Sequence, residues 1–176
     1  MKIAVFGGTF DPPTVGHMGV IAYCLQSNFD QVWVVPSKKG WFKPKRADFY
    51  SRCHMLTAAI LEAFGSDPRV QVIPIESELP KERVPLIDLW CELLRRYPEH
   101  QFTLVVGEDV WKNMPSWEGG ELLATKVPVL VVPRQPDGRI SSTWARRLIH
   151  ENLPTNAILP GSVSEMIHQN GWYRHD

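Results

Sequence analysis

The chain has 176 residues, and its 19 Lys and Arg side chains balance its 19 Asp and Glu side chains, so the formal net charge is zero. This length suits one domain with an ample core. Because the basic residues form no long run, the charge pattern gives no sign of binding to nucleic acid or to a membrane surface. No apolar stretch approaches the ~20 residues of a membrane span. The N-terminus enters an apolar run at once, which leaves no room for a signal peptide.

The cysteine pattern bounds the compartment. Cys24, Cys53 and Cys91 are odd in number, widely spaced and embedded in apolar helical patterns. They lack the C-x-x-C spacing of a metal-binding pair. The pattern predicts buried thiols in a soluble cytoplasmic protein, with a disulfide or a reactive thiol as the alternative. The oligomeric state is left open, because the sequence identifies no exposed apolar stripe.

The first element of the chain is the apolar run Ile3–Phe6, which predicts a strand. The polar, glycine-rich stretch GGTFDPPTVGH, Gly7–His17, follows it directly, and an apolar helical pattern over Met18–Leu25 comes next. The predicted order is therefore strand, turn, loop and helix. This order places a loop and the beginning of a helix directly beyond the carboxyl end of a strand.

The residue types in this loop favour phosphate binding. Gly7 and Gly8 have no Cβ, so their amides can approach an anion closely. A helix that begins near Gly16 adds unpaired N–H donors and the positive end of its dipole. His17, in the first turn, can donate to a phosphate oxygen. We therefore predict a triphosphate site at this loop.

The rest of the chain alternates between strand-length and helical patterns. The apolar runs are rich in Val and Ile without strict alternation, which is typical of strands buried on both faces of a parallel sheet. They are Ile3–Phe6, Val32–Val35, Val70–Ile73, Phe102–Val106 and Val127–Val132. Helical patterns include Asp48–Phe64, with Asp48 as N-cap, and Leu86–Tyr97. Two more, Ser142–Glu151 and Ser162–Asn170, are expected to cap the same domain.

These patterns predict an α/β fold over residues 1–176: a single-domain, Rossmann-like, doubly wound parallel sheet with C-terminal helices. Ligands bind such sheets beyond the carboxyl ends of the strands, at the point where the strand order reverses. Gly7–His17 follows the first strand and Gly107-Glu108-Asp109 follows the fourth. Both segments should therefore lie at that edge.

The loop resembles the signature of the nucleotidylyltransferase superfamily, G-[GS]-[ST]-F-D-P followed by [HT]-x-G-H. Ile140–Arg146, ISSTWAR, resembles the superfamily's second signature, I-S-S-T-x-x-R. Val106–Asp109 and Met114–Trp117 are similar to the G-x-D and P-[ST]-W elements of bacterial nicotinate mononucleotide adenylyltransferases. Ile167–Arg174 is similar to the terminal helix and tail of that branch. The resemblance covers nearly the whole chain in the right order.

The resemblance implies transfer of AMP from ATP to nicotinate mononucleotide, which forms deamido-NAD and pyrophosphate, with Mg²⁺ accompanying ATP. Such a reaction depends on positioning and charge stabilisation rather than on a protein nucleophile. The sequence has no Gly-x-Ser-x-Gly elbow, zincin motif or Walker motif. No metal site formed by protein side chains is expected.

The resemblance also assigns residue roles. His17 and Arg146 would be catalytic, stabilising charge on the α-phosphate and the leaving pyrophosphate. Asp109 would accept from the ribose or adenine of ATP, or act as a helix N-cap. For Arg146 the alternative is a solvated side chain behind a serine N-cap. The residues expected to bind ATP are Gly7, Gly8, Thr9, Phe10, Thr14, His17, Gly107, Asp109, Ser142, Thr143 and Arg146.

Thr14 occupies a position where the nicotinate branch often has His, whereas Thr is more typical of phosphopantetheine adenylyltransferases. Its hydroxyl can donate to a phosphate oxygen but cannot carry charge. Val84–Ile87 is apolar where the nicotinate branch usually has Ser-Tyr-Thr to contact the base. These departures keep open other phosphate acceptors, nicotinamide mononucleotide or 4′-phosphopantetheine. A nucleotide-binding regulator without turnover is the alternative of a different class.

On the acceptor side, the basic loop after the second strand supplies candidate phosphate ligands, Lys38, Lys39 and Lys43, or a solvated surface. Arg52, at the beginning of the next helix, is a further candidate. Trp117 lies where the family has an aromatic ring that stacks on the pyridine. ATP and a mononucleotide are thus the expected partners.

Overall fold

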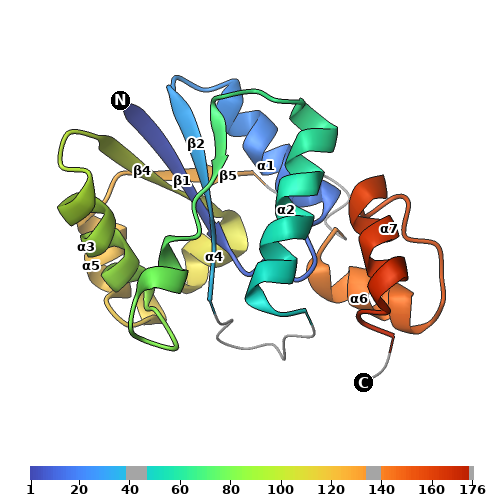
Figure 1. Cartoon of the computed structure of the whole chain (residues 1–176). Helices are drawn as coiled ribbons and strands as arrows, with labels where there is room; N and C mark the ends of the chain where they lie inside the picture. Colours follow the sequence, from blue (N-terminus) through green and yellow to red (C-terminus); the bar gives the residue numbers. More distant parts are fainter. Residues whose placement is uncertain (39–46, 134–139, 175–176) are drawn as a thin grey trace.

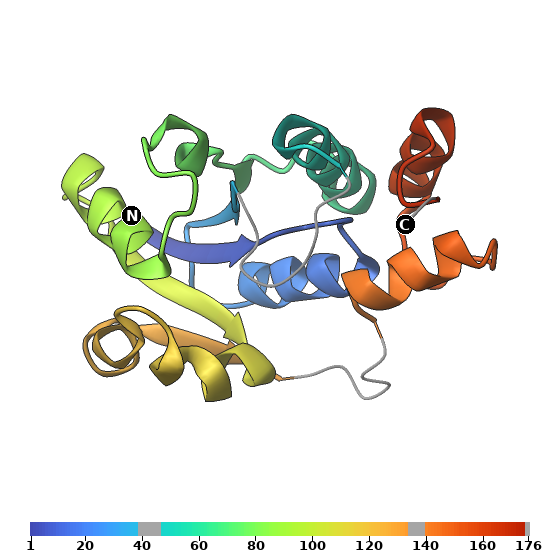
Figure 2. The same ribbon diagram turned by 90° about the horizontal axis from the view of Figure 1, so that it is seen from below.

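The computed structural model describes residues 1–38, 47–133 and 140–174 (Figure 1). One sheet of five strands has the order β3-β2-β1-β4-β5, and every pair is parallel. Helices cover both faces of the sheet, as Figure 2 shows. The predicted α/β, doubly wound architecture is confirmed. The strands are β1 Lys2–Gly8, β2 Gln31–Pro36, β3 Val70–Val72, β4 Gln101–Gly107 and β5 Val129–Val132.

The strand order reverses at β1, which lies between β2 and β4. Gly8 pairs with Pro36 of β2, and Phe6 pairs with Val105 of β4. The glycine loop therefore leaves the sheet at the topological switch point, where ligands of such sheets bind. β5 begins two residues later than predicted, because Val127 is the C-cap of the preceding helix and Pro128 has no amide hydrogen.

The helices agree with the predicted segments to within a few residues. The structure also contains short helices between them. α2 begins after Asp48, whose carboxylate accepts from the amide of Ser51 at 2.9 Å, so the predicted N-cap is confirmed. It ends before Gly65, whose φ of 62° lies in the left-handed region. The helices are α1 Val15–Leu25, α2 Phe49–Phe64, α3 Leu86–Arg96, α4 Glu108–Asn113, α5 Gly120–Lys126, α6 Ser142–His150 and α7 Gly161–Asn170, with 3-10 turns η1 Ile75–Glu78 and η2 Met114–Ser116.

Two hydrophobic cores lie on the two faces of the sheet. Successive strand residues point to opposite faces, so Ala4 and Phe6 join the core with α1, α2, α6 and α7, and Ile3 and Val5 join the core with α3 and α5. This two-sided burial explains why the apolar runs do not alternate. The C-terminal helices α6 and α7 lie beside α1 and α2, as the predicted cap (Figure 1).

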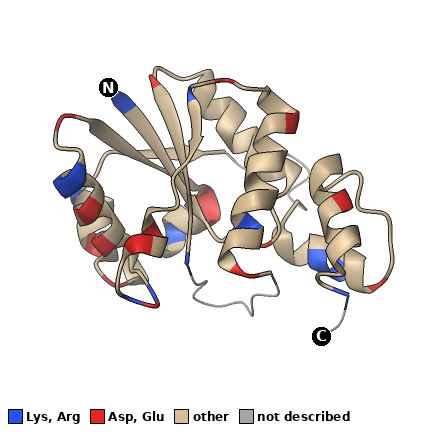
Figure 3. Ribbon diagram, viewed as in Figure 1, with Lys and Arg blue, Asp and Glu red and all other residues tan. Residues whose placement is uncertain are grey.

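The helices carry charged residues of both signs. In the view of Figure 3, acidic and basic residues are interspersed over the helices. The three cysteines are unpaired, but they differ in environment: Cys24 is buried, Cys53 is half-buried and Cys91 is exposed. Burial raises the pKa of the Cys24 thiol to about 11. The prediction that all three are buried was wrong for Cys91. Within the described ranges, no helix is long and apolar enough to cross a membrane.

Candidate active site

The glycine loop folds over its own aromatic side chain. Phe10 is 1% exposed and has a φ of 48°, in the left-handed region. Its ring meets the ring of Phe6 edge-on, with centroids 5.5 Å apart, and that of His17 at 5.0 Å. A Cβ on Gly8 would lie 3.0 Å from the Phe10 ring, whereas the nearest atom to a Cβ on Gly7 would be 4.0 Å away. Gly8 therefore makes room for the aromatic core of the loop.

The first turn of α1 orients the predicted catalytic histidine. Thr14 is the N-cap and is 1% exposed. Its amide donates to Nδ1 of His17 at 2.9 Å, and its hydroxyl lies 2.9 Å from the same nitrogen. Because Nδ1 accepts from an amide, the proton of a neutral imidazole is on Nε2. In this structure the Thr14 hydroxyl thus contacts His17, and its contact with a phosphate stays a prediction.

The second signature binds the first across more than 100 residues of sequence. The Ser142 hydroxyl donates to the carbonyl of Pro12 at 2.8 Å, and Nη1 of Arg146 donates to the carbonyl of Asp11. Nη2 of Arg146 donates to the Thr143 hydroxyl at 3.3 Å, so the predicted common face of these two residues is confirmed. Ser141 is the N-cap, accepting from the Trp144 amide.

Arg146 is therefore a site-facing residue and not a surface one. It is 9% exposed, which makes the alternative of a solvated side chain wrong. Ser142 and Thr143, its neighbours in the second signature, help to hold the guanidinium against the same loop, which leads into His17. The two residues predicted to be catalytic thus lie against one segment, residues 10–17, rather than on opposite sides of the molecule.

The carboxyl end of β4 provides the third part of the predicted ATP site. Gly107 is the last residue of β4 and the N-cap of α4, and a Cβ built on it would have no atom within 4 Å. The space beside this backbone is therefore open. Asp109 is exposed and lies inside α4, so its alternative role as the helix N-cap is wrong. Its contact with ATP stays a prediction.

Arg52 has a structural environment that the sequence pattern did not indicate. It is fully buried, and its guanidinium donates to the carbonyls of Thr9, of Ser37 at 2.9 Å and of Lys38 at 3.2 Å. Burial lowers the pKa of Arg52, while the nearby charge of Asp11 opposes this effect. Arg52 thus ties the loop after β1 to the loop after β2. These contacts occupy donors of Arg52, and its contact with an acceptor phosphate stays a prediction.

Of the three lysine candidates for the acceptor phosphate, Lys38 is the one that lies among the described residues. The Lys38 amide donates to the Glu76 carboxylate at 2.7 Å, and its Nζ donates to the Leu79 carbonyl at 3.1 Å. Lys38 is therefore directed toward the segment after η1. Lys39 and Lys43 lie outside the described residues.

The expected base-recognition region is part of the second core. Trp117 follows η2 and is half-buried against that core. Val84 and Pro85 are buried, with Pro85 as the N-cap of α3. Gly119 has a φ of 69°, and a Cβ on it would lie 2.7 Å from Ile87. The apolar character of Val84–Ile87 is thus explained by packing.

Asp11 and Tyr173 form a buried contact that sequence reasoning missed. The Tyr173 hydroxyl donates to Oδ1 of Asp11 at 2.7 Å, and each residue is 2% exposed. The two residues are 162 positions apart in the chain. Their presence in the first signature and in the terminal tail was visible, but nothing in either motif indicates that they pair.

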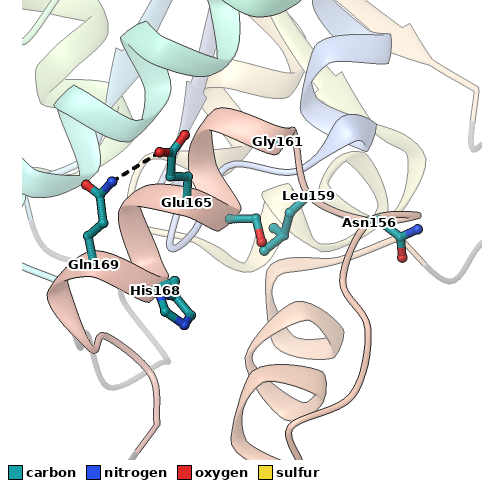
Figure 4. Close-up of a pocket in the computed structure, with 7 residues that line it drawn as sticks. Asn156, Leu159, Gly161, Glu165, His168 and Gln169 are labelled. Atoms are coloured by element: carbon teal, nitrogen blue, oxygen red, sulfur yellow. Dashed lines mark hydrogen bonds between the residues drawn. The ribbon is translucent and has the colours of Figure 1, made fainter.

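One surface hollow lies away from the glycine loop. A surface depression of about 570 Å³ runs along α7, lined by Asn156, Glu165 and His168 among others. Figure 4 shows the Glu165–Gln169 hydrogen bond beside it. The chemistry favours the glycine loop over this hollow, because a histidine and a buried guanidinium both contact the loop.

A doubly wound parallel sheet with these donors at its switch point defines a Rossmann-like protein of the nucleotide-binding class. The chain belongs to the cytidylyltransferase-like family, whose model matches residues 5–168. It is 31% identical to a Bacillus pumilus protein named "probable nicotinate-nucleotide adenylyltransferase" and 28% identical to the nicotinate-nucleotide adenylyltransferase of Bacillus subtilis; each alignment covers 98% of both chains.

The fold is shared with the Plasmodium falciparum nicotinic acid mononucleotide adenylyltransferase, which was solved in complex with NaAD. The TM-score is 0.85 at 20% identity, over 99% of this chain and 98% of the other.

Proposed function

We propose that the protein is a nicotinate mononucleotide adenylyltransferase, which transfers AMP from ATP to nicotinate mononucleotide and releases pyrophosphate. The observation that carries the reaction class is that His17 of α1 and Arg146 of α6 both contact the glycine loop at the switch point of the sheet. The acceptor is inferred from relatives that are named for this activity and whose alignments cover 98% of both chains.

In the proposed reaction, an oxygen of the acceptor phosphate attacks the α-phosphorus of ATP as the bond to the pyrophosphate oxygen breaks. The amides of Gly7 to Phe10 would supply oriented donors for the triphosphate, and the positive dipole end of α1 would favour its negative charge. Nε2–H of His17 donates to an α-phosphate or bridging oxygen. Arg146 has five N–H donors, of which the contacts to Asp11 and Thr143 use two, so others can meet the leaving group.

Mg²⁺ would enter this site as a complex with ATP. In the described part of the chain, no three His, Cys, Asp or Glu side chains gather to hold a metal ion. Phosphate oxygens and water suit Mg²⁺ as ligands, so a dedicated protein cage is not needed. The ion would neutralise part of the charge on the phosphates.

On the acceptor side, Trp117 would stack on the pyridine ring and a lysine of the loop after β2 would meet the phosphate. Lys43 and Lys39 are favoured over Lys38 and Arg52, because donors of the latter two contact backbone carbonyls. Asp109 would accept from the ribose or adenine of ATP. Such an enzyme would work where ATP is made and used, in the cytoplasm.

The experiment is a measurement of pyrophosphate release from Mg-ATP with three acceptors: nicotinate mononucleotide, nicotinamide mononucleotide and 4′-phosphopantetheine. We expect release with the pyridine mononucleotides and the highest kcat/KM with the nicotinate form. Preference for phosphopantetheine would reassign the acceptor. ATP binding without release in any reaction would identify the nucleotide-binding regulator instead.

A further inference from the structure

The carboxylate of Asp11 is the centre of a buried polar cluster at the glycine loop. Oδ1 accepts from the Tyr173 hydroxyl at 2.7 Å. Oδ2 is buried, lies 3.9 Å from Nη1 of Arg146, and has no hydrogen-bond partner among the described residues. The same Nη1 donates to the backbone carbonyl of Asp11. The side chain of Asp11 is therefore close to Arg146 without making a direct hydrogen bond to it.

The position of Tyr173 is set by the C-terminal helix. α7 packs on α2 and ends at Gly171, whose φ of 69° turns the chain back. Tyr173 follows with a φ of 64° and is 2% exposed. Burial and the neighbouring charge of Asp11 raise the pKa of the Tyr173 hydroxyl, so it stays protonated and can only donate to the carboxylate.

Two cations act on this carboxylate. Arg146 lies beside it, and the charge of Arg52 also interacts with it. In a buried setting the attraction between a carboxylate and a guanidinium is strong, and their preferred contact is a close, bidentate one. At 3.9 Å the Asp11–Arg146 pair stops short of that contact. The other carboxylate oxygen, Oδ1, accepts from the Tyr173 hydroxyl.

We propose that Tyr173 is a positioning residue for the nucleotidyl transfer: its hydroxyl holds the Asp11 carboxylate away from Arg146, so that the guanidinium stays available to the phosphates. The inference rests on the proposed function. Without the hydroxyl, the carboxylate turns toward Arg146 and competes with the triphosphate for its donors. The value of kcat falls, because the guanidinium of Arg146 is then paired with Asp11 and stabilises the negative charge on the leaving pyrophosphate less.

The kinetic test uses Tyr173→Phe, which removes one oxygen and keeps the ring. A hydrogen bond to a charged group typically corresponds to roughly a tenfold to hundredfold effect, and we expect kcat to fall by that factor with a change in KM for ATP below about threefold. Tyr23→Phe is the matched control, since the same change is made on a side chain that is 40% exposed on α1. Its kcat should equal that of the unchanged protein.

A second comparison distinguishes positioning from general support of the fold. In an Asp11→Asn background there is no carboxylate charge to restrain, so adding Tyr173→Phe should change kcat by less than about twofold. A loss in that background as large as in the unchanged protein would overturn the proposal. The comparison does not need the single Tyr173→Phe variant to be well folded, since neither protein of the pair carries the unpaired carboxylate.

A crystal structure of the Tyr173→Phe variant tests the inference without any activity. The Asp11 Oδ2–Arg146 Nη1 distance should shorten from 3.9 Å to about 3 Å, the range of a charge-assisted hydrogen bond. An unchanged distance would overturn the proposal. Absence of pyrophosphate release by the unchanged protein with every acceptor would instead defeat the proposed function, and the structural result would still stand on its own.

Discussion

The Thr14 amide donates a hydrogen bond to Nδ1 of His17 at 2.9 Å, one turn into α1. This contact selects the tautomer in which Nε2 carries the hydrogen, and it fixes the plane of the ring. Thr14 thus orients His17 in this structure. Its backbone performs the orientation, and the side chain adds a second contact to the same nitrogen.

His17→Ala and Arg146→Ala should each lower kcat by roughly a hundredfold to a thousandfold, or about 2.7–4 kcal/mol of transition-state stabilisation. ATP affinity should change much less, because both donors are assigned to charge that develops during transfer. Arg147→Ala is the control, since that neighbouring side chain is 65% exposed and pairs with Glu151. Steady-state kcat and KM measure the two effects. Equal losses in ATP affinity and in rate would show that these residues bind the ground state and the transition state equally.

Thr14→Val should lower kcat only about twofold to tenfold, because the backbone amide still orients His17 and one neutral hydrogen bond is lost. Valine has nearly the shape of threonine, so the buried N-cap position keeps its packing. The comparison is with His17→Ala under the same conditions. A loss as large as that of His17→Ala would show that the hydroxyl itself meets a phosphate.

Arg52→Met should destabilise the protein by about 3 kcal/mol, since the carbonyls of Thr9, Ser37 and Lys38 lose a buried donor. Equilibrium unfolding in urea measures the change, and Arg69→Met serves as the control because the Arg69 side chain is 50% exposed. If Arg52 instead binds the acceptor phosphate, the variant will keep its stability and show a raised KM for the mononucleotide.

Glu62 links α2 to the beginning of α7, and its contribution should depend on pH. Hydrogen bonds from Ser162 and from the Gly161 amide hold its pKa below the usual 4.5. The folded-state pKa is depressed, so the stabilisation is present above about pH 4.5 and is lost as pH falls through the folded value. The site is exposed, which limits the effect to roughly 0.5–1 kcal/mol.

The measurement is the difference in Tm between the unchanged protein and Glu62→Gln at pH 7 and at pH 3. We expect a lower Tm for the variant at pH 7 and a smaller difference at pH 3, which lies below the usual carboxyl pKa of 4.5, so that protonation of the unfolded state reduces the stabilisation. A difference that grows on acidification would contradict the assigned sign.

The apolar Val84–Ile87 segment should weaken discrimination between nicotinate and nicotinamide mononucleotides. Pro85 has no amide hydrogen, and no side chain of the segment can hydrogen-bond the carboxylate of the base. The proposed stacking on Trp117 would not distinguish the two rings. The ratio of kcat/KM values under identical Mg-ATP should stay below roughly ten-thousandfold, the scale of a fully hydrogen-bonded site. A larger preference would show that donors elsewhere in the site recognise the acid.

Local patterns predicted much of the architecture. The valine-rich runs predicted β1 to β4 closely, and Asp48 and Gly65 predicted both ends of α2, because caps and periodicity act over a few residues. The three-residue spacing of Thr143 and Arg146 likewise predicted their shared face. The placement of Gly7–His17 and Gly107–Asp109 at one edge followed from the parallel topology, which brings the carboxyl ends of neighbouring strands together.

Tertiary structure alone decided which polar groups meet. Asp11 and Tyr173 are at opposite ends of the chain, and Arg52 lies in a helix where an arginine usually faces solvent. Sequence specifies that such groups exist, but a buried donor takes whichever acceptor the packed backbone brings within about 3 Å. That choice depends on how α2, α6 and α7 settle against the loop after β1. The spacing of residues along the chain does not predict which of these buried polar groups pair.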